Sequence, residues 1–401
     1  MLKKISVRDV RLGMFIEQLC GSWLDHPFWK KAFVLESEKD LLALKACGID
    51  EVWIDPSKGL DVEVVPAPVA NEQGPAEALP QAPAGDRKPE RRFALHEEIQ
   101  RVQRLPARAK KTVALIFEDS RKGNVLRLAE AIELVEEIIQ SVSRNSGALL
   151  SLSRLRSEDD HTYLHSVAVS ALMIALGRQM DMDGGTLKSL GLAGLLHDVG
   201  KMAIPDEIIN KPGKLTAKEF DLVKTHARRG LEMLKPEPGL DDVVLDVCLH
   251  HHERMDGTGY PDQLSGASLS LHARMAAVCD VYDALTSDCS YRRAYSPADA
   301  IRKMTEVQDV HFDKTVFHAF VKTVGIYPSG TLVKLKSGRL AVVTDQSVKS
   351  LTTPVVKAFF STKTNEPIFP VLVDTSKIPD VIASVEDPAK WKLDLKAMTG
   401  I

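Results

Sequence analysis

A proline-rich segment divides this chain and argues against a single continuous fold. Residues 66–89 consist mainly of Pro, Ala, Gly, Gln and Glu, and six prolines are spaced through them: Pro66, Pro68, Pro75, Pro80, Pro83 and Pro89. Each proline lacks a backbone N–H, and large apolar side chains are scarce, so this segment cannot form a core. We therefore expect two folded parts joined by a linker over residues 63–92.

The short part before the linker, residues 1–62, has the pattern of a small α/β domain. Glu51–Ile54 reads as a strand, and it follows an apolar helical pattern that begins after Ser37 and contains Leu41, Leu42 and Leu44. Nothing in this part has the spacing of catalytic residues.

The long part after the linker is expected to be helical over residues 93–325 and β-rich over 326–401, so the fold class is mostly α. An apolar stripe recurs at helical spacing in Val125, Leu128, Ala129, Ile132, Val135, Ile139 and Val142. Further helices are expected over 164–177, 186–196, 216–234, 243–252, 270–285 and 297–305. A β-hairpin is expected at 331–335 and 341–343, with more strands at 355–360 and 368–373.

The composition limits the possible partners and compartment. The 401 residues include 52 Lys and Arg against 55 Asp and Glu, a formal charge of −3. This balance argues against binding to a nucleic-acid polymer or an anionic membrane, which needs a basic excess.

No stretch approaches the ~20 apolar residues of a membrane span. The N-terminus lacks a signal core, and the five cysteines form no Cys-x-x-Cys pair, so we expect a cytoplasmic protein with reduced thiols.

The histidines are concentrated in the helical part, where seven of the twelve lie between residues 161 and 252. Imidazole and carboxylate groups recur at or near predicted helix ends: His165, His197, Asp198, His226, His251, His252 and Asp280. These groups are ligands for Fe, Mn, Zn and similar divalent ions. An adjacent His-Asp pair suits a two-metal site, because one carboxylate can bridge both ions. Any one of these histidines alone would more simply be a structural residue, but their number favours a metal site.

Two motifs in this region resemble the HD-GYP branch of the HD metal-dependent phosphohydrolases. The first is His197-Asp198-x-Gly200-Lys201. The second is a longer and more specific string that runs from His251-His252-Glu253 to Asp256-Gly257-Thr258-Gly259-Tyr260-Pro261. The resemblance covers about residues 125–325. The first sixty residues resemble a short uncharacterised domain often found ahead of HD-GYP domains, best at Gly13-Met14 and Trp23-Leu24-x-His26-Pro27-Phe28.

The resemblance implies hydrolysis of cyclic di-GMP to linear pGpG, and in some members onward to GMP. It implies that the seven groups above bind two divalent metal ions, with iron or manganese fitting the His-rich ligand set best. Lys201 matches a family lysine near the scissile phosphate, and Asp198 is central to catalysis as a metal ligand. The GYP loop, made of Asp256, Gly257, Gly259, Tyr260 and Pro261, is associated with shaping the site and with partner contact, for example with a diguanylate cyclase.

Two positions depart from the family pattern. His161 lies one helical turn before His165, where some relatives have a Glu that binds a third metal, so His161 is either a third-metal ligand or a neighbouring polar group. Cys289 stands where the family usually has an Arg that clamps a ligand phosphate, and Arg292 and Arg293 are the candidate substrate-binding residues that remain.

Two other functions remain open from the sequence. One is an HD phosphohydrolase that acts on another nucleotide phosphoester. The other is a module that senses cyclic di-GMP and contacts a partner with little turnover, a hypothesis motivated by Cys289. A homodimer is a further possibility. The complete ligand set and Lys201 favour the enzyme.

Overall fold

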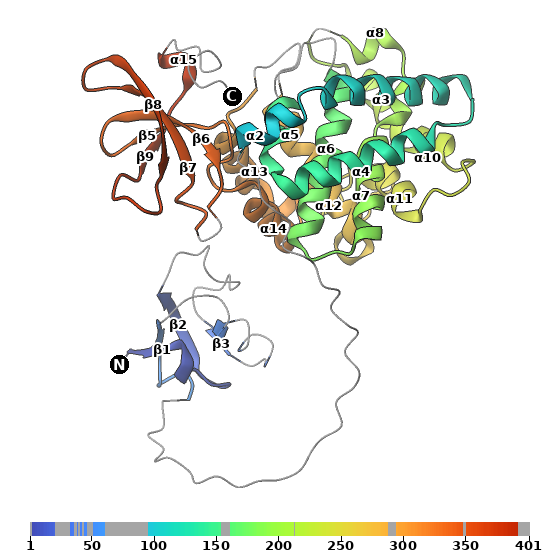
Figure 1. Ribbon diagram of the computed structural model, residues 1–401. Coiled ribbons are helices and arrows are strands. Elements are labelled where there is room, and N and C mark those ends of the chain that lie inside the picture. Colours follow the sequence, from blue (N-terminus) through green and yellow to red (C-terminus); the bar gives the residue numbers. More distant parts are fainter. Residues whose placement is uncertain are drawn as a thin grey trace, which may run out of the picture. The chain divides into compact units, whose positions relative to one another are not determined.

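Figure 1 shows a computed structural model of the chain. The structure describes residues 2–20, 33–35, 38, 41, 44, 45, 51–60, 95–153, 161–211, 213–287, 294–347 and 350–391. The chain forms two compact units, Met1–Gly85 and Asp86–Ile401, and each is described by itself. The linker and most of the expected helix after Ser37 lie outside the described residues. The expected domain boundaries at 62, 92 and 325 stay predictions.

The N-terminal unit contains a four-stranded antiparallel sheet in the order β1-β4-β2-β3. The strands are β1 (Lys3–Ser6), β2 (Phe15–Cys20), β3 (Phe33–Val34) and β4 (Glu51–Ile54). A short 3-10 helix, η1 (Val7–Asp9), follows β1. Apolar side chains from the sheet and its connections form a small core that includes Val10, Met14, Ile16, Val52 and Ile54, all fully buried.

The second unit is mostly helical, as the sequence predicted. Its helices are α2 (Leu95–Arg101), α3 (Leu105–Lys122), α4 (Leu128–Arg144), α5 (Ser146–Ser153), α6 (His161–Gln179), α7 (Gly184–Leu196), η3 (Val199–Ala203), α8 (Asp206–Ile209), α9 (Ala217–Lys224), α10 (His226–Leu234), α11 (Asp242–His250), η4 (Gly266–Ser268), α12 (Leu271–Thr286), α13 (Pro297–His311) and α14 (Lys314–Val324). Side-chain caps fix where several helices begin, because a side-chain oxygen accepts a hydrogen bond from an otherwise unpaired backbone N–H. The capping residues are Asp183, Thr216, Asp241, Ser270, Ser296 and Asp313.

Helix α6 lies at the centre of the helical part, surrounded by α3, α5, α7 and α12 (Figure 1). Every side chain from Leu164 to Leu176 is buried, which agrees with a sequence that is apolar on all faces. Gly194 lets α7 approach α6 closely, since a Cβ at Gly194 would lie 2.7 Å from the Ser170 backbone of α6. Across the described residues, none of the helices combines the length and apolarity needed to cross a membrane.

The prediction of which apolar residues of α4 are buried was partly wrong. Val125 precedes the helix and is 80% exposed, and Ile132 is 41% exposed. The buried face runs instead through Ala131, Leu134, Val135, Ile138 and Val142. The helix has apolar residues on two adjacent faces, and packing against α6 and α7 selects the second.

The single helix expected over 216–234 is two helices in the structure. Helix α9 ends at Lys224, and α10 begins at His226. The hydroxyl of Thr225, between them, donates to the carbonyl of Leu222 at 2.6 Å. Side chains of α9 are not fully buried, whereas α10 buries His226 and Ala227. The break therefore directs the start of α10 toward the core.

A five-stranded antiparallel sheet follows the helices, in the order β8-β7-β6-β5-β9. The strands are β5 (Leu332–Leu335), β6 (Arg339–Asp345), β7 (Val355–Ser361), β8 (Glu366–Asp374) and β9 (Ile382–Val385), and a short helix, α15 (Pro388–Trp391), comes last. The β-rich appendage was expected, including the hairpin of β5 and β6, while β9 was not. Asn145 Nδ2 donates to Asp345 Oδ1 at 2.8 Å, which ties the end of α4 to the sheet.

Candidate metal centre

Seven side chains that sequence analysis proposed as metal ligands come together in the helical part. His165 lies in the second turn of α6, Asp280 lies in the middle of α12, and the others lie at helix ends. They form two groups: His165, His197 and Asp280 in one, and Asp198, His226, His251 and His252 in the other. Within each group the candidate ligand atoms lie within 4.8 Å of one another. Each group could therefore hold one metal ion.

Two carboxylates connect the groups. Asp198 Oδ2 lies 3.3 Å from His197 Nε2, while its Oδ1 lies 3.4 Å from His226 Nε2. Asp280 spans both groups in the same way, with Oδ1 3.0 Å from His165 Nε2 and Oδ2 3.6 Å from His252 Nδ1. Each carboxylate thus faces both positions, as a bridging ligand of a two-metal site would.

Hydrogen bonds from Nδ1 orient most of these imidazoles. The Nδ1–H of His197 donates to the Gly194 carbonyl at 2.8 Å, that of His226 to Val223 at 2.7 Å, and that of His251 to Val247 at 3.0 Å. These carbonyls lie in the last turns of α7, α9 and α11. The arrangement leaves Nε2 of each ring directed at the centre, which is how ligand histidines are commonly held.

The donor set fits divalent cations. His197 Nε2 and Asp198 Oδ1 are buried and have no hydrogen-bond partner within the described part of the chain, a costly state unless another group binds them. Burial lowers the pKa of His226 and His251, and lowers that of His252 to about 3, so these rings are neutral at pH 7. Neutral imidazole is the form that binds a metal.

The remaining charges also suit metal binding. Burial raises the pKa of Asp198, but Lys201 and His197 outweigh burial and hold it well below its usual range, so the carboxylate is ionised. Burial lowers the pKa of His165, whereas hydrogen bonds to Asp280 and Asp283 outweigh burial and raise it to about 9. A metal that binds His165 therefore displaces a proton.

Lys201 reaches the centre from η3. Its ammonium donates to Asp198 Oδ2, and its side chain is 25% exposed. The approach depends on Gly200, because a Cβ there would lie 1.9 Å from the carbonyl oxygen of His226 and 2.4 Å from the nitrogen of Gly230. Glycine therefore allows η3 and α10 to touch, which brings Asp198 and His226 together.

The GYP loop covers one side of the centre. The Tyr260 ring lies 4.7 Å from the His252 ring, measured between centroids. Gly257 has φ +77°, and a Cβ on Gly259 would lie 2.4 Å from Glu253 Cα, so both positions need glycine. Glu253 Oε1 accepts from the N–H of Asp262 at 2.6 Å, which fastens the loop.

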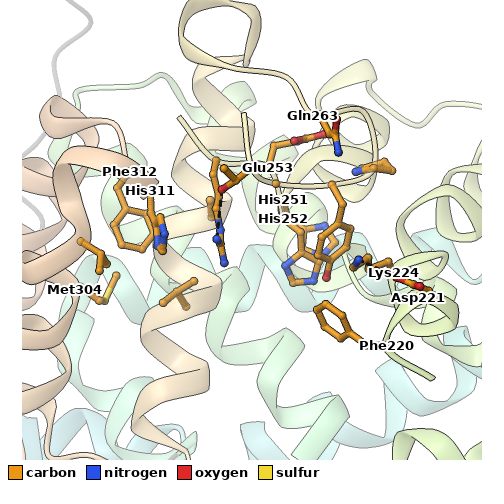
Figure 2. A pocket seen from close by; sticks show the side chains of 18 of the residues that line it. Phe220, Asp221, Lys224, His251, His252, Glu253, Gln263, Met304, His311 and Phe312 are labelled. Carbon is orange, nitrogen blue, oxygen red and sulfur yellow. Dashed lines mark hydrogen bonds and ion pairs between the residues drawn. The ribbon is translucent and has the colours of Figure 1, made fainter. Parts of the chain in front are cut away.

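A cavity of about 870 Å³ opens beside His251 and His252 (Figure 2). The GYP loop forms its roof, and α9, α10, α12 and α13 supply its other walls. The volume is in the range of small-molecule sites. Four of its lining residues are cationic: Lys224, Arg228, Arg254 and Lys303. Lys224 and Arg228 pair with Asp221 and Asp262, so positive charge for an anionic ligand comes mainly from Arg254 and Lys303.

Some residues singled out in the sequence are not placed by the structure. Cys289, Arg292 and Arg293 lie outside the described residues, as does the side chain of His161, whose backbone begins α6. His250, the third histidine in a row, belongs to neither group. Its Nδ1 contacts Asp246 at 2.7 Å and its Nε2 contacts Asp262 at 3.3 Å.

Sequence reasoning missed two residues at the centre. Asp283 Oδ2 accepts from His165 Nδ1 at 2.7 Å, and Glu253 is buried beneath the loop. The Asp280-x-x-Asp283 spacing could have indicated the first, because it puts both carboxylates on one face of α12. For Glu253 the sequence held no comparable signal apart from its place in the GYP motif.

The fold and the paired His and Asp groups define the class: an HD-type phosphohydrolase with side chains that could bind divalent metals. Residues 133–316 match the HD domain family, and residues 2–131 match a domain of unknown function, DUF3391. The chain belongs to the HD-GYP branch of the HD-domain proteins, with an N-terminal DUF3391 domain, as its sequence motifs predicted.

One relative that the chain covers almost completely supports this placement. The chain is 52% identical over 401 residues to a cyclic di-GMP phosphodiesterase of Pseudomonas aeruginosa, covering 98% of this chain and 94% of the relative. It is 35% identical over 189 residues to a 3′3′-cGAMP-specific phosphodiesterase of Vibrio cholerae, covering 47% and 42%. A solved HD-GYP-type protein from Bdellovibrio bacteriovorus is 15% identical, with a TM-score of 0.48, and covers 80% of this chain and 99% of that one.

Proposed function

We propose that this protein is a metal-dependent phosphodiesterase that hydrolyses cyclic di-GMP to linear pGpG, with further hydrolysis to GMP as a second step to be tested. The observation that carries the proposal is the pair of ligand groups joined by Asp198 and Asp280 beside a cavity lined with cations. The 52% identical relative, which the chain covers almost completely, is itself named a cyclic di-GMP phosphodiesterase.

The residues of the centre divide the chemistry among them. Bound divalent metals would supply Lewis-acid polarisation of a phosphoryl oxygen and an activated water. His165, His197 and Asp280 would hold one ion, and Asp198, His226, His251 and His252 would hold the other. The Lys201 ammonium contacts Asp198 Oδ2, and from there it would stabilise negative charge or protonate the leaving oxygen. Tyr260 shields His252 from solvent on the cavity side.

The identity of the metals is a finer part of the proposal. The set of five imidazoles and two carboxylates suits iron or manganese, because both accept mixed nitrogen and oxygen ligands. We propose two ions, with a third at His161 as a secondary candidate.

Partners and location complete the proposal. Asp256 and Thr258 are exposed at the tip of the GYP loop and are available to a diguanylate cyclase or to a second copy of the chain. The buried free cysteines Cys248 and Cys279 agree with a cytoplasmic location.

The test is to load the protein anaerobically with Fe²⁺ or Mn²⁺, measure metal content, and follow cyclic di-GMP by chromatography. We expect linear pGpG and then GMP. Asp198→Ala should lose bound metal and at least about 10³-fold in turnover, since a bridging ligand serves both ions. Tight binding of cyclic di-GMP with negligible turnover under both metals would instead support the sensing module. Turnover of other nucleotide phosphoesters alone would support the broader hydrolase.

A further inference from the structure

The cavity extends to both sides of the histidine pair His251–His252. Figure 2 shows Phe220 and Lys224 on one side of the pair, and Met304, His311 and Phe312 on the other. A cyclic dinucleotide has two bases on opposite sides of its phosphodiester ring. A cavity that passes a centrally placed cleavage site therefore offers a separate subsite to each base.

The Phe220 end is suited to stacking. The Phe220 side chain borders the cavity and is 45% exposed, and its ring lies 6.5 Å from that of Tyr260. The charged groups here are engaged with one another: Lys224 with Asp221, and Arg228 with Asp262. Lys224 Nζ lies over the Phe220 ring, 4.8 Å from its centroid, so a base would stack on the other face of the ring. Such stacking accepts any base, because every base has a π-face.

The opposite end combines an apolar slot with hydrogen-bond donors. Val281 and Leu285 of α12 and Met304 and Val307 of α13 line it. Arg254 lies on the loop side of this slot, exposed, with Nη1 3.4 Å from Thr258 Oγ1. Lys303 adds a second cation from α13. These residues offer apolar contact to the faces of a base and a guanidinium to its polar edge.

We propose that Arg254 selects guanine in this second subsite by donating two hydrogen bonds to O6 and N7 of the base. The proposal rests on the proposed function. The planar fork of arginine matches these two acceptors, whereas adenine presents an amino donor at the O6 position and would repel it. One end of the cavity thus discriminates between purines, and the other does not.

This asymmetry has a consequence for a mixed substrate. With 3′3′-cGAMP, guanine takes the Arg254 subsite and adenine stacks on Phe220, so only one of the two phosphodiesters lies at the metal centre. In hydrolysis, the water oxygen bonds to phosphorus, the P–O3′ bond breaks, and the O3′ atom takes a proton. Cleavage therefore gives one linear isomer, pGpA or pApG, rather than both.

The experiment incubates metal-loaded full-length protein with 3′3′-cGAMP and separates the two linear isomers against standards. We expect the wild type to favour one isomer by about ten-fold, since a bidentate contact discriminates by that order. Arg254→Gln should abolish or reverse the preference, because glutamine pairs with adenine. Arg254→Lys keeps the positive charge but not the planar pair of donors, so it should also lose most of the isomer preference.

Phe220→Ala is the matched control. It should slow turnover of cyclic di-GMP and 3′3′-cGAMP by similar factors and keep the isomer preference. Binding of phosphorothioate analogues gives a second readout: the wild type should bind cyclic di-GMP about ten-fold more tightly than cyclic di-AMP, and Arg254→Gln should not. Equal amounts of both isomers from the wild type, an unchanged preference in Arg254→Gln, or failure to bind 3′3′-cGAMP would overturn the proposal. If cyclic di-GMP is neither bound nor cleaved, the proposed function itself fails.

Discussion

Asp283 influences the candidate metal centre through one histidine. Its carboxylate accepts the Nδ1–H of His165, and the Nε2 of that ring faces Asp280. A carboxylate behind a ligand histidine fixes the orientation of the ring and increases its basicity, and losing such a partner typically lowers metal affinity about 10–100-fold.

We therefore expect Asp283→Asn to weaken metal binding by that factor, with turnover largely restored at saturating metal. Competition with a chelator measures the affinity, and a metal titration of activity measures the recovery. Asp299→Asn is the control, because Asp299 pairs with Ser296 and Arg302 at the start of α13. Equal metal affinity in Asp283→Asn and the wild type would contradict this role.

At this scale the sequence predicted the clustering of the candidate ligands better than the groups around them. The motifs place His197 beside Asp198 and His251 beside His252, so the closeness within each pair could be anticipated. The partner of His165 Nδ1 could not, because it depends on how α6 packs against α12. Helix packing also sets which histidines share a group.

Helix α4 shows how packing chooses between two apolar faces. Ile138 is fully buried, while Ile132, on the face that the sequence stripe favoured, is 41% exposed. Ile138→Ala should lower the free energy of unfolding by about 2–5 kcal/mol through lost burial and a cavity. Ile132→Ala should change it by less than about 1 kcal/mol. Urea denaturation of both variants measures the difference, and similar losses would show that the buried face is assigned wrongly.

The break between α9 and α10 had no clear sequence signal. Thr225 is an ordinary helical residue, and no Gly or Pro marks the boundary. The break follows from tertiary packing, which buries His226 against Gly200 and leaves α9 more exposed. The strand β9 was missed for a related reason: four residues, Ile382–Val385, are too few to show a pattern without their partner β5.

On the scale of the whole molecule, the ligand groups connect five helices of the second unit. A metal that binds only the folded state stabilises it, by about 2.7 kcal/mol when free metal exceeds its dissociation constant 100-fold. Chelation should therefore lower the thermal midpoint of this unit, and added Mn²⁺ should restore it. Calorimetry or circular dichroism measures the shift, and Asp198→Ala should show almost none. A thermal midpoint that chelation leaves unchanged in the wild type would contradict metal binding at these ligand groups.

The two carboxylates shared between the ligand groups mean that the metal positions are not independent. An ion in one group would engage Asp198 and Asp280, which also face the other group, so the affinity for the second ion should differ from that for the first. Activity would then depend on the weaker of the two binding steps.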